Sequence, residues 1–157
     1  MTAAKVLQAL EARGWSLALA ESLTGGLLAD SFVSVPGASK VLRGSIVAYS
    51  SDIKHELLGV DDALLTEVGA VDPGVAIEMA VGAANRLGAE VGLSATGVAG
   101  PDEQDGNPVG TVFIGIVTPN GSDVVPLQLT GTRQEIRTQA ASAAVEALLA
   151  VLTENSQ

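Results

Sequence analysis

A serine and two glycines lie together where the sequence predicts the end of a strand and the start of a helix. The motif Glu21–Gly26 (ESLTGG) follows a short apolar run and precedes an apolar helical stretch. Ser22 at such a turn would be presented much as a nucleophile is in strand–turn–helix hydrolases. Gly25 and Gly26 would let the backbone approach a ligand, and free N–H groups at the helix start attract anions. The alternative is that Ser22 and Thr24 only cap the helix.

A lysine and a tyrosine flank the end of a second predicted strand, 44–50. Tyr49 is the single tyrosine of the chain, and Lys54 falls in the first turn of the next predicted helix. The charge of Lys54 opposes the positive end of the helix dipole there. The dipole together with burial would lower the pKa of Lys54, which is the condition for a lysine to act as a general base toward serine. His55, the single histidine, is the rival base, and a surface lysine is the simpler alternative.

A loop of small residues follows a third predicted strand, 91–95. Such a loop leaves backbone amides uncovered and suits contact with a substrate or an oxyanion. The polar segment Glu103–Asn107 could then close as a lid, or it is a solvated loop. Asp102 and Asp105 could hold a divalent cation, but the calcium-loop pattern is absent and we expect no metal. The loop residues expected to contact substrate are Thr96, Gly97, Ala99 and Gly100.

Two arginines, Arg133 and Arg137, lie one turn apart at the start of the last predicted helix. Basic residues are electrostatically disfavoured at a helix N-terminus, so this pair could bind a phosphate or a carboxylate. The alternatives are an intrahelical ion pair or a contact with a partner.

Composition excludes several classes of function. The chain has 157 residues, a net charge of −10, no cysteine and one histidine. Thiol nucleophiles, thiolate zinc sites and multi-histidine metal centres are therefore excluded, and the acidic balance argues against nonspecific nucleic-acid binding. No apolar run is long enough to span a bilayer, and the N-terminal segment is amphipathic rather than a signal peptide. We expect one cytoplasmic domain, 1–157, without cofactor or membrane partner.

Helical and strand-like segments alternate along the whole chain. Asp72-Pro73 starts a long helix, and Thr132–Glu135 fits a capping box that opens the last one. Nearly continuous apolar strands between helices predict an α/β/α sandwich of three layers with a mixed, mostly parallel sheet, and a hairpin at 119–121 makes one strand antiparallel. Ligands in such sheets bind beyond the carboxyl ends of the strands. The predicted strands are 15–20, 44–50, 91–95, 109–117 and 124–129.

Several motifs in order resemble the CinA C-terminal domain family, the nicotinamide-mononucleotide deamidase family, over roughly Val6 to Leu152. The motifs are AESLTGG (20–26), GSIVAYS (44–50) with Lys54 after it, GAVDP (69–73), and SATGVAGP (94–101) ahead of PVGTVFIGI (108–116). Many members carry an additional N-terminal nucleotide-processing domain, and we expect this chain to be a stand-alone form without it.

The resemblance implies an α/β/α sandwich that hydrolyses the carboxamide of nicotinamide mononucleotide to nicotinate mononucleotide and ammonia. It implies Ser22 as nucleophile, Lys54 as base and Tyr49 as a hydrogen-bonding or relay group. It also places Thr96 before the glycine loop and Arg137 against the substrate phosphate. The chain departs from the family pattern at Ser51, where asparagine is common, and at Thr132, where aspartate is common and would affect the ion pairing of Arg133.

Three classes of function remain open from the sequence. The first is the amidohydrolase, with a small nucleotide as substrate and a homo-oligomeric state. The second is a noncatalytic or regulatory module that binds a nucleotide or sugar phosphate. The third is an interaction protein in which the sandwich mainly assembles.

Overall fold

A five-stranded mixed sheet forms the centre of the structure, a computed structural model that describes residues 2–154. The strand order is β2-β1-β3-β4-β5. β1 pairs in parallel with β2 and β3, whereas β4 runs antiparallel to both β3 and β5. The strands are β1 (Leu17–Glu21), β2 (Leu42–Val47), β3 (Val91–Gly97), β4 (Thr111–Thr118) and β5 (Gly121–Gln128).

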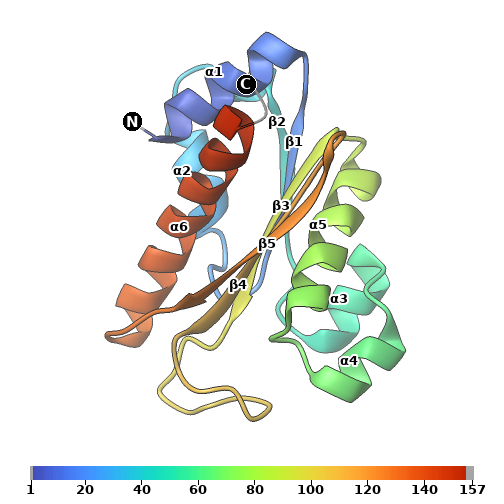
Figure 1. Ribbon diagram of the computed structural model, residues 1–157, viewed down its shortest axis with the longest axis vertical. Helices are drawn as coiled ribbons and strands as arrows, with labels where there is room; N and C mark the ends of the chain where they lie inside the picture. The colour runs from blue at the N-terminus through green and yellow to red at the C-terminus, as the bar shows by residue number, and fades with distance from the viewer. Residues whose placement is uncertain (1, 155–157) are drawn as a thin grey trace.

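Helices cover both faces of the sheet (Figure 1). One face carries α1 (Thr2–Arg13), α2 (Leu27–Val33) and α6 (Arg133–Glu154), and the other carries α3 (Ser51–Leu58), α4 (Asp62–Val68) and α5 (Pro73–Leu87). A short 3-10 helix, Ala38–Lys40, was not predicted. The α/β/α sandwich expected from the sequence is confirmed. In the part of the chain described, no helix is long and apolar enough to cross a bilayer.

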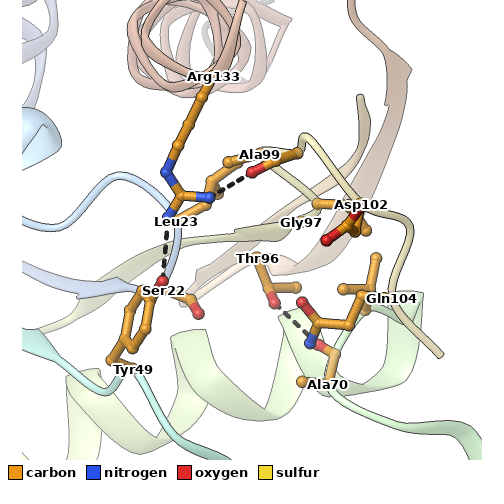
Figure 2. Close-up of a pocket in the computed structure, with 13 residues that line it drawn as sticks. Ser22, Leu23, Tyr49, Ala70, Thr96, Gly97, Ala99, Asp102, Gln104 and Arg133 are labelled. Carbon is orange, nitrogen blue, oxygen red and sulfur yellow. Dashed lines mark hydrogen bonds between the residues drawn. The ribbon is translucent and has the colours of Figure 1, made fainter. Parts of the chain in front are cut away.

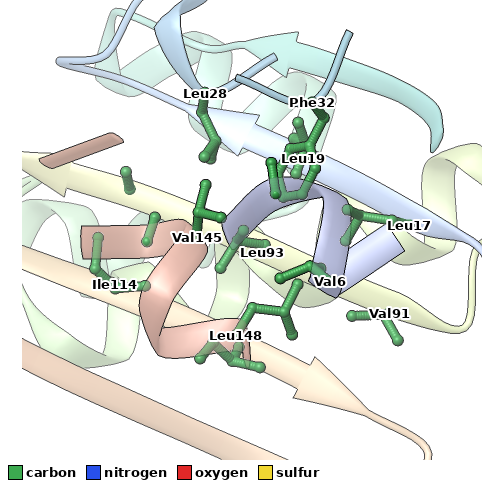
Figure 3. Packing of buried hydrophobic residues seen from close by; sticks show 14 of the residues in the cluster. Val6, Leu17, Leu19, Leu28, Phe32, Val91, Leu93, Ile114, Val145 and Leu148 are labelled. Atoms are coloured by element: carbon green, nitrogen blue, oxygen red, sulfur yellow. The ribbon is translucent and has the colours of Figure 1, made fainter. Parts of the chain in front are cut away.

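Alternating side chains of the strands build two separate cores. Leu17 and Leu19 of β1 point toward α1, α2 and α6, where they join a large aliphatic cluster (Figure 3). Ala18 and Ala20 point the other way, toward α3 and α5. This alternation follows from the pleat of a strand and continues past its end. Consecutive residues at the end of β1 are therefore delivered to opposite faces of the sheet.

Small residues bring α5 unusually close to the sheet. A Cβ atom at Gly92 would collide with the Ala80 carbonyl, and one at Gly115 would collide with the Ala76 carbonyl. Only glycine at these two strand positions leaves room for the helix backbone. The close packing holds α5 against the sheet, and the loop before α5 forms one wall of the candidate site.

Two predicted helix starts are confirmed in atomic detail. The Asp72 side chain accepts hydrogen bonds from the backbone of Gly74 at 2.7 Å and of Val75 at 3.3 Å. Thr132 N–H donates to Glu135 Oε1 at 3.0 Å, and Glu135 N–H donates to Thr132 Oγ1 at 3.2 Å. Both patterns satisfy backbone donors that a helix N-terminus otherwise leaves free.

Candidate active site

Loops that follow β1, β2 and β3 meet at the carboxyl edge of these parallel strands. They enclose a pocket of about 170 Å³, to which the loop before α5 and the start of α6 also contribute (Figure 2). This is the edge at which the sequence placed the ligand. The lining residues are Ser22, Leu23, Tyr49, Ala70, Val71, Thr96, Gly97, Val98, Ala99, Gly100, Asp102, Gln104 and Arg133.

Ser22, which lines this pocket, is in direct contact with Lys54, which does not line it. Lys54 Nζ lies 2.9 Å from Ser22 Oγ, 2.8 Å from the Ala48 carbonyl oxygen and 2.9 Å from the Tyr49 carbonyl oxygen. Ser22 follows β1 on the face opposite Leu19, and Lys54 reaches it from the first turn of α3. The side chains are 8% and 1% exposed, respectively. The structure thus brings together the two residues expected to act as nucleophile and base.

The surroundings of Lys54 favour an amine that can lose its proton. Burial lowers the pKa of Lys54 from its ordinary 10.5 to about 8. Within residues 2–154, Lys54 forms no ion pair that would oppose this shift. The two carbonyls can accept the two N–H bonds of a neutral amine, whose lone pair then faces Ser22 Oγ. The geometry therefore suits transfer of the serine proton to the lysine.

His55 is not part of this arrangement. Its Nδ1 lies 2.7 Å from the carbonyl oxygen of Val60, and its ring does not line the pocket. The rival base considered from the sequence is therefore separated from Ser22, although it is adjacent to Lys54 in the chain.

Tyr49 and Arg133 form the outer rim of the pocket. Arg133, the first residue of α6, donates hydrogen bonds to the Gly100 carbonyl and, at 3.1 Å, to the Tyr49 hydroxyl. Tyr49 is 64% exposed, and it is its carbonyl, not its hydroxyl, that meets Lys54. The hydroxyl expected as a relay is thus bonded to an arginine. Arg133 forms no ion pair within the described residues.

The glycine loop after β3 forms another wall of the pocket, as the sequence predicted. Gly97, Ala99 and Gly100 line it. Thr96 is 1% exposed and donates its hydroxyl to the Ala70 carbonyl at 2.8 Å, so it holds the opposite wall in place. Among the described residues, nothing accepts a hydrogen bond from the backbone N–H of Ala99 or Gly100. Two backbone donors without an acceptor among the described residues therefore belong to residues that line the pocket.

The segment Glu103–Asn107 folds back onto the loop before α5. Asp105 accepts a 3.4 Å hydrogen bond from Ala70 N–H, and Asn107 Nδ2 lies 3.3 Å from the Val71 carbonyl. Gly69 makes this possible, because a Cβ atom there would collide with the Asp105 carboxylate. In this structure the segment is docked across the edge of the pocket. Asp102 and Gln104 line the pocket itself.

The N-terminal amides of α2 are not free, and this corrects an expectation. The buried carboxylate of Glu21 accepts hydrogen bonds from the backbone of Gly26 at 3.0 Å, Leu28 at 2.9 Å and Ala29 at 3.1 Å. An anion cannot use donors that Glu21 already occupies. Thr24, Gly25 and Gly26 do not line the pocket either. Glu21 was not predicted to have a role. It shares one face of the strand with Leu17 and Leu19, however, and this alternation predicts that its side chain is buried.

Arg137 also lies outside the pocket. Its guanidinium donates to the Leu23 carbonyl at 2.8 Å, to the Thr24 carbonyl at 3.2 Å and to Gln134 Oε1 at 2.8 Å. Of the two arginines at the start of α6, Arg133 faces the pocket, whereas Arg137 contacts the turn that carries Ser22.

Fold and site together define an α/β/α domain with a buried serine–lysine pair beside a polar pocket. Residues 1–152 match the model of the CinA C-terminal domain. The chain belongs to this family.

Individual relatives agree with this assignment. A CinA-like protein from Frankia casuarinae is 48% identical over 141 residues, covering 90% of this chain and 33% of that protein. The chain thus spans about a third of this curated relative. The competence damage-inducible protein A from Klebsiella pneumoniae superposes with a TM-score of 0.93 at 30% identity, covering 97% of this chain and 95% of that one. CihA, a competence/damage inducible protein from Agrobacterium tumefaciens, superposes with a TM-score of 0.91 at 34% identity, covering 97% of this chain and 93% of that one.

Proposed function

We propose that this domain is an amidohydrolase with Ser22 as nucleophile and Lys54 as general base. The observation that carries the proposal is the 2.9 Å contact between Ser22 Oγ and a buried amine whose pKa is lowered to about 8. An amide is a poor electrophile, so its hydrolysis without a metal needs an activated nucleophile of this kind. Serine–lysine pairs are a known variant of the serine–histidine–aspartate triad.

The proposed reaction proceeds through an acyl-enzyme. Neutral Lys54 takes the Ser22 proton while Oγ bonds to the carboxamide carbon, and the amide oxygen becomes an oxyanion. The Lys54 ammonium then protonates the departing nitrogen, which leaves as ammonia. Water attacks the resulting ester with Lys54 as base, and the acid is released as Ser22 regains its proton. The N–H groups of Ala99 and Gly100 are candidate oxyanion donors, because they have no other partner among the described residues.

Nicotinamide mononucleotide is the substrate that we propose, giving nicotinate mononucleotide and ammonia. Family membership supports this choice, and so does a pocket that pairs a nucleophile with a guanidinium. Arg133 is the candidate for the substrate phosphate, since its side chain lines the pocket and has no carboxylate partner within residues 2–154. Asp102, on the same rim, is a candidate for the ribose hydroxyls. The reaction would belong to pyridine nucleotide recycling in the cytoplasm.

Ammonia release from nicotinamide mononucleotide tests the proposal. We expect turnover by the wild type and a loss of at least about 1,000-fold in Ser22→Ala and Lys54→Met, because members of a catalytic unit act together. Ser31→Ala, which removes a hydroxyl that bonds to Leu27 in α2, is the matched control and should retain activity. Equal rates in wild type and Ser22→Ala would refute the role of Ser22. Tight binding without product would favour a noncatalytic nucleotide-binding module.

A further inference from the structure

The turn between β1 and α2 is held by two oppositely charged side chains, neither of which enters the pocket. Glu21 binds the N–H groups at the end of the turn, and Arg137 binds the carbonyls in its middle. Ser22 lies at the start of the same turn. Its orientation toward Lys54 therefore depends on how these two side chains fix the backbone.

Glu21 is fully buried, and its carboxylate accepts hydrogen bonds from two sides. Its carboxylate accepts from three backbone N–H groups of the turn and of α2, and from Ser45 Oγ at 2.7 Å. A charged acceptor makes these hydrogen bonds stronger than a neutral one would. Because Glu21 precedes Ser22 directly, its carboxylate anchors the chain to α2 immediately before the nucleophile.

Arg137 reaches the turn from α6, far away in the sequence. Its Nε and Nη2 atoms donate to consecutive carbonyls, those of Leu23 and Thr24. Gly25 permits the approach: its φ is +56°, and a Cβ atom there would lie 3.2 Å from Arg137 Nη2. A larger residue would be strained and would crowd the guanidinium.

The contact with Arg137 also sets the direction of a peptide N–H group. In a trans peptide the N–H points opposite to the C=O. The Leu23 carbonyl points to Arg137, so the Thr24 N–H points away from it. No described residue accepts a hydrogen bond from the N–H of Leu23 or Thr24. Leu23, which lines the pocket, follows the nucleophile directly, and this is the position that supplies an oxyanion donor in strand–turn–helix hydrolases.

We propose that Arg137 is a positioning residue, which acts with Glu21 to hold the Ser22 turn and to aim its free N–H groups, and is not a ligand of the substrate phosphate. This inference rests on the proposed nucleophilic role of Ser22. A positioning residue affects every substrate that reacts at Ser22, whereas a phosphate ligand affects only substrates that carry the phosphate.

Two substrates and one covalent label for the serine distinguish a positioning role of Arg137 from a role as phosphate ligand. Arg137→Met removes the guanidinium and keeps an apolar stem. We expect kcat to fall about 10- to 100-fold for both nicotinamide mononucleotide and nicotinamide riboside, with KM within about twofold of wild type for each. The control Gln134→Ala removes the Nη1 partner of Arg137 but neither turn contact, and it should behave as wild type. A rise of KM confined to the mononucleotide would overturn the proposal.

Labelling of Ser22 by an uncharged fluorophosphonate tests the turn without relying on the substrate. In this reaction the serine oxygen bonds to phosphorus, fluoride leaves and Lys54 takes the proton. The rate, followed by intact mass, should fall about 10-fold or more in Arg137→Met and in Glu21→Gln, with an unchanged pH midpoint. Ser45→Ala keeps the three backbone contacts of Glu21 and should label normally.

Folding is checked by melting curves, with labelling done well below each midpoint. Wild-type labelling rates in a folded Arg137→Met protein would refute the positioning role. If the wild type turns over neither substrate, the proposed function fails, and the labelling rates still decide whether Arg137 positions Ser22.

Discussion

The pH dependence of the reaction is the sharpest consequence of the buried lysine. Burial lowers the pKa of Lys54 to about 8, and only the neutral amine can accept the Ser22 proton. The neutral fraction is then about one tenth at pH 7 and about nine tenths at pH 9. We therefore expect kcat/KM to rise about tenfold per pH unit below 8 and to level off above it. An unburied lysine would instead place the inflection above pH 10.

The assay is initial-rate ammonia release from nicotinamide mononucleotide between pH 6 and 9.5, with product confirmed by chromatography. Ionisation of the substrate phosphate falls near pH 6, so nicotinamide riboside serves as a second substrate without that group. His55→Gln is the control for a histidine inflection, since His55 Nδ1 contacts the Val60 carbonyl and not Ser22. Its profile should match that of the wild type.

A profile that is flat from pH 6.5 to 9 would refute the assignment of Lys54 as base. So would an inflection near pH 6.5 that disappears in His55→Gln, because it would transfer the role to the histidine. Any residual activity of Lys54→Met should lack the inflection near pH 8.

Three further predictions concern stability and binding. The pKa of Lys54 is lower in the folded chain than its ordinary 10.5, so the unfolded chain binds more protons between pH 8 and 10.5. The free energy of unfolding therefore rises with pH in this range. Urea unfolding should show a gain of up to about 3 kcal/mol in wild type relative to Lys54→Met. Arg133→Ala should raise KM for nicotinamide mononucleotide about 10- to 100-fold and leave the riboside unaffected, as measured by initial rates. Gly69→Ala, at φ +77° and against Asp105, should lower the free energy of unfolding by about 1 kcal/mol or more and increase proteolysis within 103–107; an unchanged urea midpoint would contradict this.

Local signals in the sequence predicted much of the fold and the centre of the site. Asp72 and the Thr132–Glu135 box act within one helical turn, so their residue types alone specify the helix starts. Residue type and predicted position made Ser22 and Lys54 candidates, and the family resemblance then assigned their expected roles as nucleophile and base. Their convergence follows from parallel strands, since β1 and β2 are neighbours whose carboxyl ends meet at one edge.

Contacts between different elements account for what the sequence did not reveal. Arg133 and Arg137 occupy equivalent local positions, and only the packing of α6 decides which one faces the pocket. The free amides expected at Gly26 are occupied by a side chain that lies earlier in the chain. β2 ends at Val47 rather than at residue 50. The residues after it leave the strand, and the carbonyls of Ala48 and Tyr49 accept hydrogen bonds from Lys54. None of these contacts has a signature within one element.

The lysine at position 54 and the location of the buried Glu21 carboxylate together determine whether the amine can lose its proton. An arginine at position 54 could bond the same carbonyls but would not release a proton near neutral pH. A lysine paired with a carboxylate would keep its proton, because the opposite charge raises its pKa. Glu21 adjoins Ser22 in the chain, yet the pleat of β1 sends its carboxylate to α2, across the sheet from α3. The strand therefore keeps the Glu21 carboxylate, which anchors the turn, away from the Lys54 amine. Without a carboxylate beside it, Lys54 can lose its proton and act as a base.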